Sequence, residues 1–360
     1  MKEELMQKAL ELSRSAIGFN SPNPLVGAVI EKNGEIIGNG YHKIAGTPHA
    51  EINAIEDALK KNKRLEGSTM YVTLEPCAHF GKTPPCLPEI VKHKISKLII
   101  SAIDPDTRNR GKGVELLKNN NIDVELGICN RDSVILNSYF FMAKTKNRPL
   151  VTGKYAMTMD GKIATEAKES KWISCEKSRK IVQKLRRESD AVIVGVGTII
   201  VDNPRLTYRP EETEEQITQD DLVFLQPYKI VIDPVLQIPE DSYIINKTPE
   251  LTILFCMKNK RKDKAQRLKD KGIEIIGVDD YPIKGDVILN ELYKRDIYSV
   301  LIEGGGKTLG RFFYDNLIDR VFAFVCPMVF GGSSAPTPAC SEGILDIKDA
   351  RKFRLESSQR

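Results

Sequence analysis

The sequence has few histidines, few aromatic residues and no long apolar run. Of its 360 residues, four are histidine, one is tryptophan and 7% are aromatic. A membrane-spanning helix needs about 20 consecutive apolar residues, and the longest candidate, 191–201, is shorter and contains two glycines. Acidic residues at positions 3, 4 and 11 leave no apolar stretch of the kind that a secretion signal requires. The sequence therefore predicts a cytoplasmic protein without a membrane span.

Cysteine number and net charge narrow the class of protein further. Seven cysteines are an odd number, and in a long chain this favours reduced thiols, some of them metal ligands, over a disulfide framework. The net charge of +5 is mildly basic. It suits an anionic small molecule as well as a nucleic acid, so charge alone leaves both open. The length predicts two or three domains.

The first half alternates between helix and strand patterns. A stripe of Leu5, Ala9, Leu12 and Ala16 predicts a helix that ends at Gly18. Thr47 and Pro48 are typical of an N-cap and a first helical residue, so we expect a helix to begin there. Further patterns predict a hairpin of 25–30 and 35–37 around Asn33-Gly34, buried strands at 70–74 and 98–102, and helices near 87–94 and 113–120.

A polar, proline-containing stretch, Asn147-Arg148-Pro149, is the predicted domain boundary. It separates a first domain, 1–146, from a second, 148–360. The second domain repeats the α/β pattern, with a helix near 176–188 and strands near 150–156, 191–196, 229–233, 251–255, 300–303 and 320–325. The acidic run 211–221 and the basic run 258–271 are interpreted as solvated surface.

The strongest chemical signal is His49-Ala-Glu51 followed by Pro76-Cys77 and Cys86. Three ligands of the type that zinc prefers leave one coordination position open, which is the catalytic arrangement. Zinc in such a site lowers the pKa of a bound water to about 7. Glu51 is placed to carry protons between that water and a substrate. The alternative, core residues or a structural metal site, would need a fourth ligand and has no use for Glu51.

These motifs resemble the cytidine-deaminase superfamily, which has H-x-E and P-C signatures. The eight residues between Cys77 and Cys86, in place of the usual two, resemble the pyrimidine deaminase domain of riboflavin biosynthesis. The match extends to 20–29, to Gly40-Tyr-His42 and to Asp104-Pro105. The resemblance implies that His42, His79 and Lys82 lie around the ribose phosphate of the substrate.

Asn23 lies between two prolines and is either a turn residue or a substrate contact. We favour the contact, because an exposed amide suits the edge of a pyrimidine.

A second motif, Ser299 to Leu309, predicts a strand, a glycine-rich turn at Gly304, Gly305 and Gly306, and a helix. Backbone amides at a helix N-terminus bind phosphate, but the pattern is neither a P-loop nor G-x-G-x-x-G. Taken alone, the turn fits a structural role equally well.

The motifs around it, in order from Lys154 to Arg209, resemble the reductase domain of riboflavin biosynthesis, which has a dihydrofolate-reductase-like fold and uses NADPH. The resemblance implies two sets of residues. Those lining NADPH are Met157, Trp172, Ser174, Thr198, Asp202 and Gly304 to Gly306. Those facing the substrate are Ser170, Arg186, Leu206, Arg209 and Glu303. The residues themselves leave alternatives open: either arginine could be a surface ion-pair residue, Trp172 could be core, and the role of Lys154 is undetermined.

Together the two resemblances imply a bifunctional deaminase–reductase with two α/β domains, one zinc ion per chain and NADPH. Its substrate is expected to be a phosphoribosylaminopyrimidine, with no nucleic acid and no membrane as partner. The sequence is compatible with a homo-oligomer and does not determine oligomeric state, transfer of the intermediate, hydride stereochemistry or regulation. Two other classes remain as alternatives, a nucleic-acid deaminase with an accessory domain and a zinc-stabilised binding protein.

Overall fold

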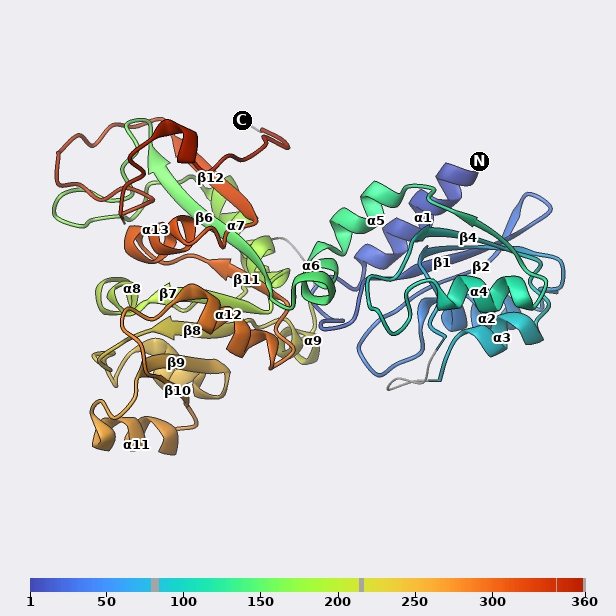
Figure 1. The fold of residues 1–360 in the computed structure, drawn as a ribbon, viewed down its shortest axis with the longest axis horizontal. Coiled ribbons are helices and arrows are strands. Elements are labelled where there is room, and N and C mark those ends of the chain that lie inside the picture. The colour runs from blue at the N-terminus through green and yellow to red at the C-terminus, as the bar shows by residue number, and fades with distance from the viewer. Residues whose placement is uncertain (79–83, 214–216, 341, 359–360) are drawn as a thin grey trace. The chain divides into compact units, whose positions relative to one another are not determined.

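The computed structural model describes residues 1–78, 84–213, 217–340 and 342–358, and the chain forms two compact units (Figure 1). The first unit comprises Met1–Pro149 and Tyr293–Tyr298, and the second comprises Leu150–Leu292 and Ser299–Arg360. Each unit is built of one sheet with helices packed on it, which confirms the predicted α/β class.

The sheet of the first unit has the strand order β2-β1-β3-β4-β5. Strand β1 is antiparallel to both of its neighbours, whereas β3, β4 and β5 run parallel. The strands are β1 Gly27–Lys32, β2 Glu35–Tyr41, β3 Thr69–Leu74, β4 Lys97–Ala102 and β5 Asp123–Leu126. The predicted hairpin and the two predicted buried strands are therefore confirmed.

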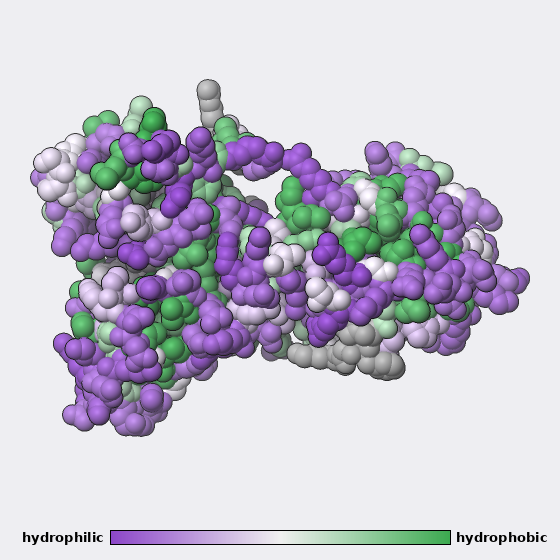
Figure 2. Space-filling view, in the orientation of Figure 1, coloured by the Kyte–Doolittle hydropathy of each residue, from purple (hydrophilic) through white to green (hydrophobic). Residues whose placement is uncertain are grey.

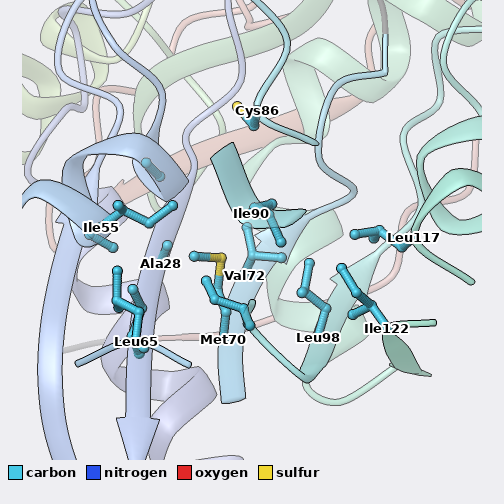
Figure 3. Close-up of a cluster of buried hydrophobic side chains, with 14 of the residues drawn as sticks. Ala28, Ile55, Leu65, Met70, Val72, Cys86, Ile90, Leu98, Leu117 and Ile122 are labelled. Carbon is cyan, nitrogen blue, oxygen red and sulfur yellow. The ribbon is translucent and has the colours of Figure 1, made fainter. Parts of the chain in front are cut away.

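Helices cover both faces of this sheet. Successive residues of each strand point to opposite sides, so one strand contributes side chains to the packing on both faces. Val29, Tyr71 and Ile99 form a cluster with the first helix, α1. Their neighbours Ala28, Val72 and Leu98 face the other way, into a larger apolar core (Figure 3). The helices are α1 Lys2–Arg14, α2 Ala50–Lys60, α3 Leu87–Lys92, α4 Lys112–Asn119, α5 Asn130–Leu136 and α6 Ser138–Lys146.

Two predicted helix ends were wrong. Helix α2 begins at Ala50 with His49 as its N-cap, because the Thr47 hydroxyl donates back to the carbonyl of Ile44, at 2.7 Å, and closes a separate turn. Helix α1 ends at Arg14 with Ser15 as its C-cap, before Gly18. The later start of α2 places Glu51 as its second residue, directly after the N-cap and Ala50.

The sheet of the second unit has seven strands, all parallel, in the order β10-β9-β8-β7-β11-β6-β12. They are β6 Leu150–Thr158, β7 Ala191–Gly195, β8 Tyr228–Ile232, β9 Thr252–Met257, β10 Glu274–Val278, β11 Ser299–Ile302 and β12 Arg320–Cys326. The six predicted strands are confirmed, and β10 was not predicted. Since β7, β11 and β6 are neighbours, their carboxyl ends share one edge of the sheet, where ligands bind in folds of this kind.

The helices of the second unit connect these strands. They are α7 Glu176–Arg187, α8 Val196–Asp202, α9 Gln219–Phe224, α10 Tyr243–Lys247, α11 Lys262–Asp270, α12 Gly285–Tyr293 and α13 Gly306–Tyr314, with short 3₁₀ turns at Pro210–Glu212, Pro249–Leu251 and Ile347–Asp349. Among the described residues, no helix has the length and apolar character needed to cross a membrane. The face seen in Figure 2 is mainly hydrophilic on both units.

Candidate active sites

His49, Cys77 and Cys86 meet at one point in the first unit. The Nδ1 atom of His49 lies 3.1 Å from the Cys86 sulfur and 3.4 Å from the Cys77 sulfur, and the two sulfurs are 3.6 Å apart. With bond lengths of about 2.0–2.3 Å, tetrahedral zinc separates such ligand atoms by about 3.5–3.8 Å. The three residues therefore fit a zinc ion, and among the described residues no fourth His, Cys, Asp or Glu joins the cluster.

The electrostatics of the cluster also suit a cation. The hydrogen bond between the two cysteine side chains, together with neighbouring His49, lowers the pKa of Cys77 to about 4 despite burial. The same hydrogen bond and burial raise the pKa of Cys86. A metal ligand must be a thiolate, and Cys77 already has this character.

Glu51 is the buried carboxyl group of this site. Its residue is 3% exposed, and burial raises the pKa of its side chain. Helix α2 starts at Ala50, so Glu51 lies in its first turn, two residues after the N-cap His49. This arrangement places a buried carboxyl beside a three-ligand metal position, and a hydrolytic deaminase needs groups of these two kinds.

Asn23 and His42 lie next to this cluster. The Asn23 amide nitrogen lies 3.0 Å from His42 Nε2, and the His42 ring packs edge-on against the His49 ring with centroids 5.2 Å apart. Tyr139 donates to the Asn23 carbonyl at 2.7 Å. Buried Asn137 binds both the amide and the carbonyl of Leu25. His79 and Lys82 lie outside the described residues.

The sequence did not single out Asn137 or Tyr139. They begin the helix α6, which was not predicted, so nothing in the local pattern marked them.

In the second unit, the glycine-rich turn lies at the carboxyl end of β11 and opens helix α13. A Cβ atom on Gly304 would come within 3.1 Å of the Gly195 nitrogen, and one on Gly306 within 2.1 Å of the Thr337 carbonyl. A Cβ atom on Gly305 would meet only the Thr198 hydroxyl, at 3.8 Å. Gly304 and Gly306 are therefore required by packing, whereas Gly305 faces open space and fits a ligand's approach.

The other residues implied in cofactor binding lie around this edge. Thr198 and Asp202 belong to α8, which follows β7, and the Thr198 hydroxyl accepts from the Gly305 amide at 3.3 Å. Met157 lies near the end of β6. Trp172 is 72% exposed, with the Arg179 guanidinium 4.6 Å from its ring centroid, so it is not a core residue. Ser174 accepts from Arg179 through its carbonyl, at 2.8 Å.

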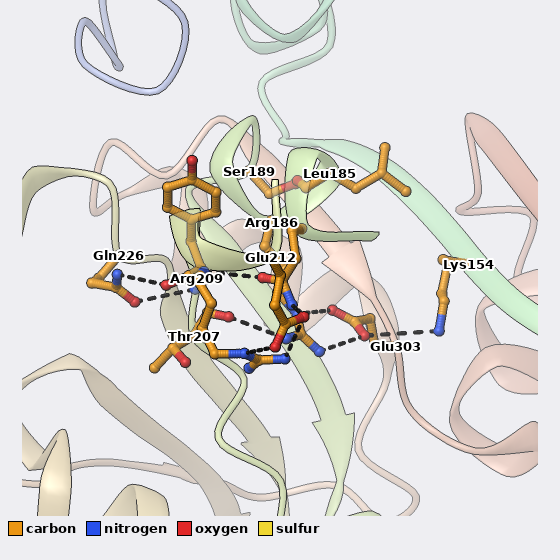
Figure 4. A network of polar contacts seen from close by, with 11 residues as sticks. Lys154, Leu185, Arg186, Ser189, Thr207, Arg209, Glu212, Gln226 and Glu303 are labelled. Carbon is orange, nitrogen blue, oxygen red and sulfur yellow. Dashed lines mark hydrogen bonds and ion pairs between the residues drawn. The ribbon is translucent and has the colours of Figure 1, made fainter. Parts of the chain in front are cut away.

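Glu303 pairs with two positively charged side chains, Arg186 and Lys154, in the interior of the second unit (Figure 4). Its carboxylate accepts from Arg186 Nε at 2.6 Å and from Nη2 at 2.9 Å, and Lys154 Nζ lies 3.9 Å away. Arg186 also donates to the carbonyl of Thr207 at 3.1 Å. Burial lowers the pKa of Lys154, whereas Arg186 and Lys154 hold the pKa of Glu303 below its usual range despite burial. Lys154, whose role the sequence left open, thus belongs to this network.

Arg209 is held by Glu212, which accepts from its Nε at 2.5 Å and from Nη2 at 3.2 Å. Glu212 also accepts from Gln183 at 2.9 Å. Within the acidic run interpreted as solvated surface, Glu212 is partly exposed and also pairs with Arg209, a contact that the sequence did not predict. Its position three residues after Arg209, on one short helical turn, was the available signal.

Leu206 has a positive φ of 55° and a side chain in the apolar core, so only its backbone is free to face a ligand. Ser170 is half-buried in the β6–α7 connection.

These two sites define a class of protein: a zinc-dependent deaminase of the cytidine-deaminase type joined to an α/β reductase. Family models match both parts. Residues 1–102 match the cytidine and deoxycytidylate deaminase zinc-binding region, and residues 149–360 match the RibD C-terminal domain.

Relatives match nearly the whole chain. The riboflavin biosynthesis protein RibD of Aquifex aeolicus is 41% identical over 352 residues, covering 98% of this chain and 94% of that protein. The structure of Acinetobacter baumannii RibD is 34% identical with a TM-score of 0.87, covering 99% of this chain and 94% of that one. A Thermotoga maritima structure, described as a diaminohydroxyphosphoribosylaminopyrimidine deaminase/5-amino-6-(5-phosphoribosylamino)uracil reductase, is 36% identical with a TM-score of 0.84, covering 98% and 93%.

The chain belongs to the RibD family. It is a bifunctional deaminase and reductase of riboflavin biosynthesis that uses zinc and NADPH, and both the function and the fold class predicted from the sequence are confirmed.

Proposed function

We propose that the first unit deaminates 2,5-diamino-6-(5-phosphoribosylamino)pyrimidin-4-one and that the second reduces the ribosyl group of the product to ribityl. The observation that carries the first activity is a buried carboxyl, Glu51, beside a three-ligand metal position. The substrate follows from the deaminase and reductase activities described for the Thermotoga maritima relative.

In the deaminase site, we assign His49, Cys77 and Cys86 as the ligands of one zinc ion. When bound there, zinc supplies an acidified water as the nucleophile. Glu51 is assigned to take a proton from the water and to deliver protons to the ring nitrogen and the departing ammonia. Asn23 and His42, which are joined through their side chains, are assigned to the pyrimidine edge and the ribose phosphate. His79 and Lys82 are assigned to the same phosphate.

In the reductase site, NADPH supplies the hydride, and the chain's residues bind and orient the two reactants. Met157, Trp172, Ser174, Thr198, Asp202 and the glycine-rich turn are assigned to NADPH. We assign Ser170, the Leu206 backbone, Arg186, Arg209 and Glu303 to the substrate, with Lys154 beside them. Because Glu303 neutralises two buried cations, its carboxylate fixes the Arg186 fork before any ligand arrives.

We further propose that the functional domains are residues 1–146 and 148–360, that the protein works in the cytoplasm and that it acts on no nucleic acid. All seven cysteines are free thiols, which suits a reducing compartment. A homo-oligomer is compatible with these assignments.

The test is a pair of assays on the same full-length protein, ammonia release from the pyrimidine nucleotide and NADPH oxidation with the deaminated product. Glu51→Gln should lower ammonia release by about 10²–10⁴-fold or more, because it removes general acid–base catalysis, and should leave NADPH oxidation intact. Glu56→Gln, an exposed carboxylate on the same helix, is the matched control. Ammonia release from an RNA oligomer instead of the nucleotide would favour the nucleic-acid deaminase alternative.

A further inference from the structure

The pair Gly331-Gly332 has no part in the two sites described above, yet both glycines have a backbone conformation that favours glycine. Their φ angles are +67° and +79°, in the left-handed region that favours glycine. A Cβ atom on Gly332 would lie 2.7 Å from a carboxylate oxygen of Glu166. The segment that contains them, 328–340, follows β12 and lies against the connection between β6 and α7.

Asp160, in that connection, binds two consecutive backbone amides of the segment. One carboxylate oxygen accepts from the Phe330 amide at 3.2 Å and from the Thr158 hydroxyl at 2.5 Å. The other oxygen accepts from the Gly331 amide at 2.8 Å. These hydrogen bonds lower the pKa of Asp160, so the group is a carboxylate at neutral pH.

Glu166 binds the same segment three residues further along. A single carboxylate oxygen accepts from the Ser334 amide at 3.2 Å and from the Ser334 hydroxyl at 2.6 Å. Two backbone hydrogen bonds complete the pairing of the two stretches, Met159 to Met328 and Ile163 to Pro336, each at 2.9 Å. The segment is thus held at both ends of the glycine pair.

Beyond these contacts, the segment packs on the glycine-rich turn. The Cys340 amide donates to the Gly306 carbonyl at 3.0 Å, and the Thr337 carbonyl occupies the space in which a Cβ on Gly306 would lie. The Cys340 sulfur lies 3.3 Å from the Thr337 amide and 3.1 Å from its carbonyl, so the two residues form one rigid turn. A shift of the segment would therefore move one wall of the turn.

We propose that Asp160 and Glu166 are positioning residues for NADPH binding. They hold segment 328–340 so that Thr337 and Cys340 form a fixed wall beside the glycine-rich turn. The inference rests on the proposed assignment of Gly304 to Gly306 to the cofactor. Both carboxylates lie on exposed residues, so their loss should cost the fold little while it loosens this wall.

Asp160→Asn tests the role of the carboxylate with almost no change in shape. An amide has one acceptor oxygen and one NH₂ group, so in either orientation the NH₂ faces a backbone N–H of Phe330 or Gly331. Glu166→Gln and the double variant complete the series. Glu169→Gln is the matched control, because Glu169 is an exposed carboxylate in the same connection whose described hydrogen bonds are made by its backbone.

Three measurements on the full-length protein are needed: the Kd for NADPH by titration, hydrogen exchange of 328–340 without cofactor, and the thermal midpoint. We expect the Kd to rise about tenfold for Asp160→Asn, the size of effect that one lost charge-assisted hydrogen bond produces, and further for the double variant. Exchange in 328–340 should be faster, with an unchanged thermal midpoint. The KM for NADPH should rise with little change in kcat.

Unchanged affinity in the double variant, with normal binding by the wild type, would overturn this inference and leave the proposed function standing. A lower thermal midpoint with normal affinity per folded molecule would overturn it in favour of a structural role. If the wild-type protein bound no NADPH, the proposed cofactor site itself would fail, and this inference with it.

Discussion

Replacing Lys229 by methionine should stabilise the second unit. Lys229 lies in β8 with no exposed surface, and its Nζ has no hydrogen-bond partner among the described residues. Burial lowers its pKa from 10.5 to about 8, an effect that Glu250 opposes and Arg186 adds to. At pH 7 the amine is therefore charged, and the folded state carries the cost of that buried charge.

The size of the effect follows from the pKa. Each pKa unit corresponds to about 1.4 kcal/mol, so a fall from 10.5 to about 8 costs the folded state about 3 kcal/mol at neutral pH. Methionine keeps an unbranched chain of similar length and removes the charge. We therefore expect Lys229→Met to raise the free energy of unfolding by about 2–3 kcal/mol at pH 7.

The pH dependence has a definite sign. Between about pH 8 and 10.5 the unfolded lysine binds more protons than the folded one, so wild-type stability rises with pH through this window. The methionine variant lacks this rise. Its advantage should be complete below about pH 8 and should disappear as the pH approaches 10.5.

Guanidinium unfolding at about pH 7 and about pH 10 measures both quantities. Trp172 is the only tryptophan and lies in the second unit, so its fluorescence, with circular dichroism, separates that unit's transition from the first unit's. Lys260→Met, at an exposed position in the same unit, is the control. A destabilised Lys229→Met variant, or an equal gain at both pH values, would refute the reasoning.

Three further predictions follow from the sites. Cys86→Ser should lose zinc by metal analysis together with deaminase activity, and full retention of zinc would contradict the ligand assignment. Glu303→Gln should lower the free energy of unfolding by about 2–4 kcal/mol in a denaturant titration, because Arg186 and Lys154 stay buried without their counter-charge. If the variant were as stable as the wild type, water or structural relaxation would have to compensate for the lost negative charge. A fragment beginning at Arg148 should bind NADPH and reduce the deaminated nucleotide without zinc, and a fragment that does not fold would disprove separable domains.

Much of the fold was predictable because it depends on near neighbours in the chain. Apolar runs such as 70–74 and 98–102 indicated strands buried on both faces, and Asn33-Gly34 indicated a tight hairpin turn. The motifs around His49 and Gly304 indicated a metal position and a strand–turn–helix. Strand β10 was missed because it begins at the exposed Glu274 and contains the exposed Gly277, so it lacks a continuous apolar run.

Other features had local signals that did not decide between two outcomes. The start of α2 depended on whether the Thr47 hydroxyl would cap a helix or close a turn with Ile44, and both are short-range options for the same residue. Glu212 looked like one charge in an acidic run until Arg209 was found beside it.

By itself, the sequence determined the kinds of chemistry that the protein carries: soft metal ligands, a carboxyl near them, a glycine-rich turn and a reductase-like series of motifs. The tertiary structure decided which charges are paired. Arg186 and Glu303 are 117 residues apart and meet because β11 lies beside β7, and Lys154 joins them because β6 lies on the other side of β11. Sheet order arises from the packing of the whole unit, and only that packing determines which buried charges meet and which, like Lys229, have no hydrogen-bond partner among the described residues.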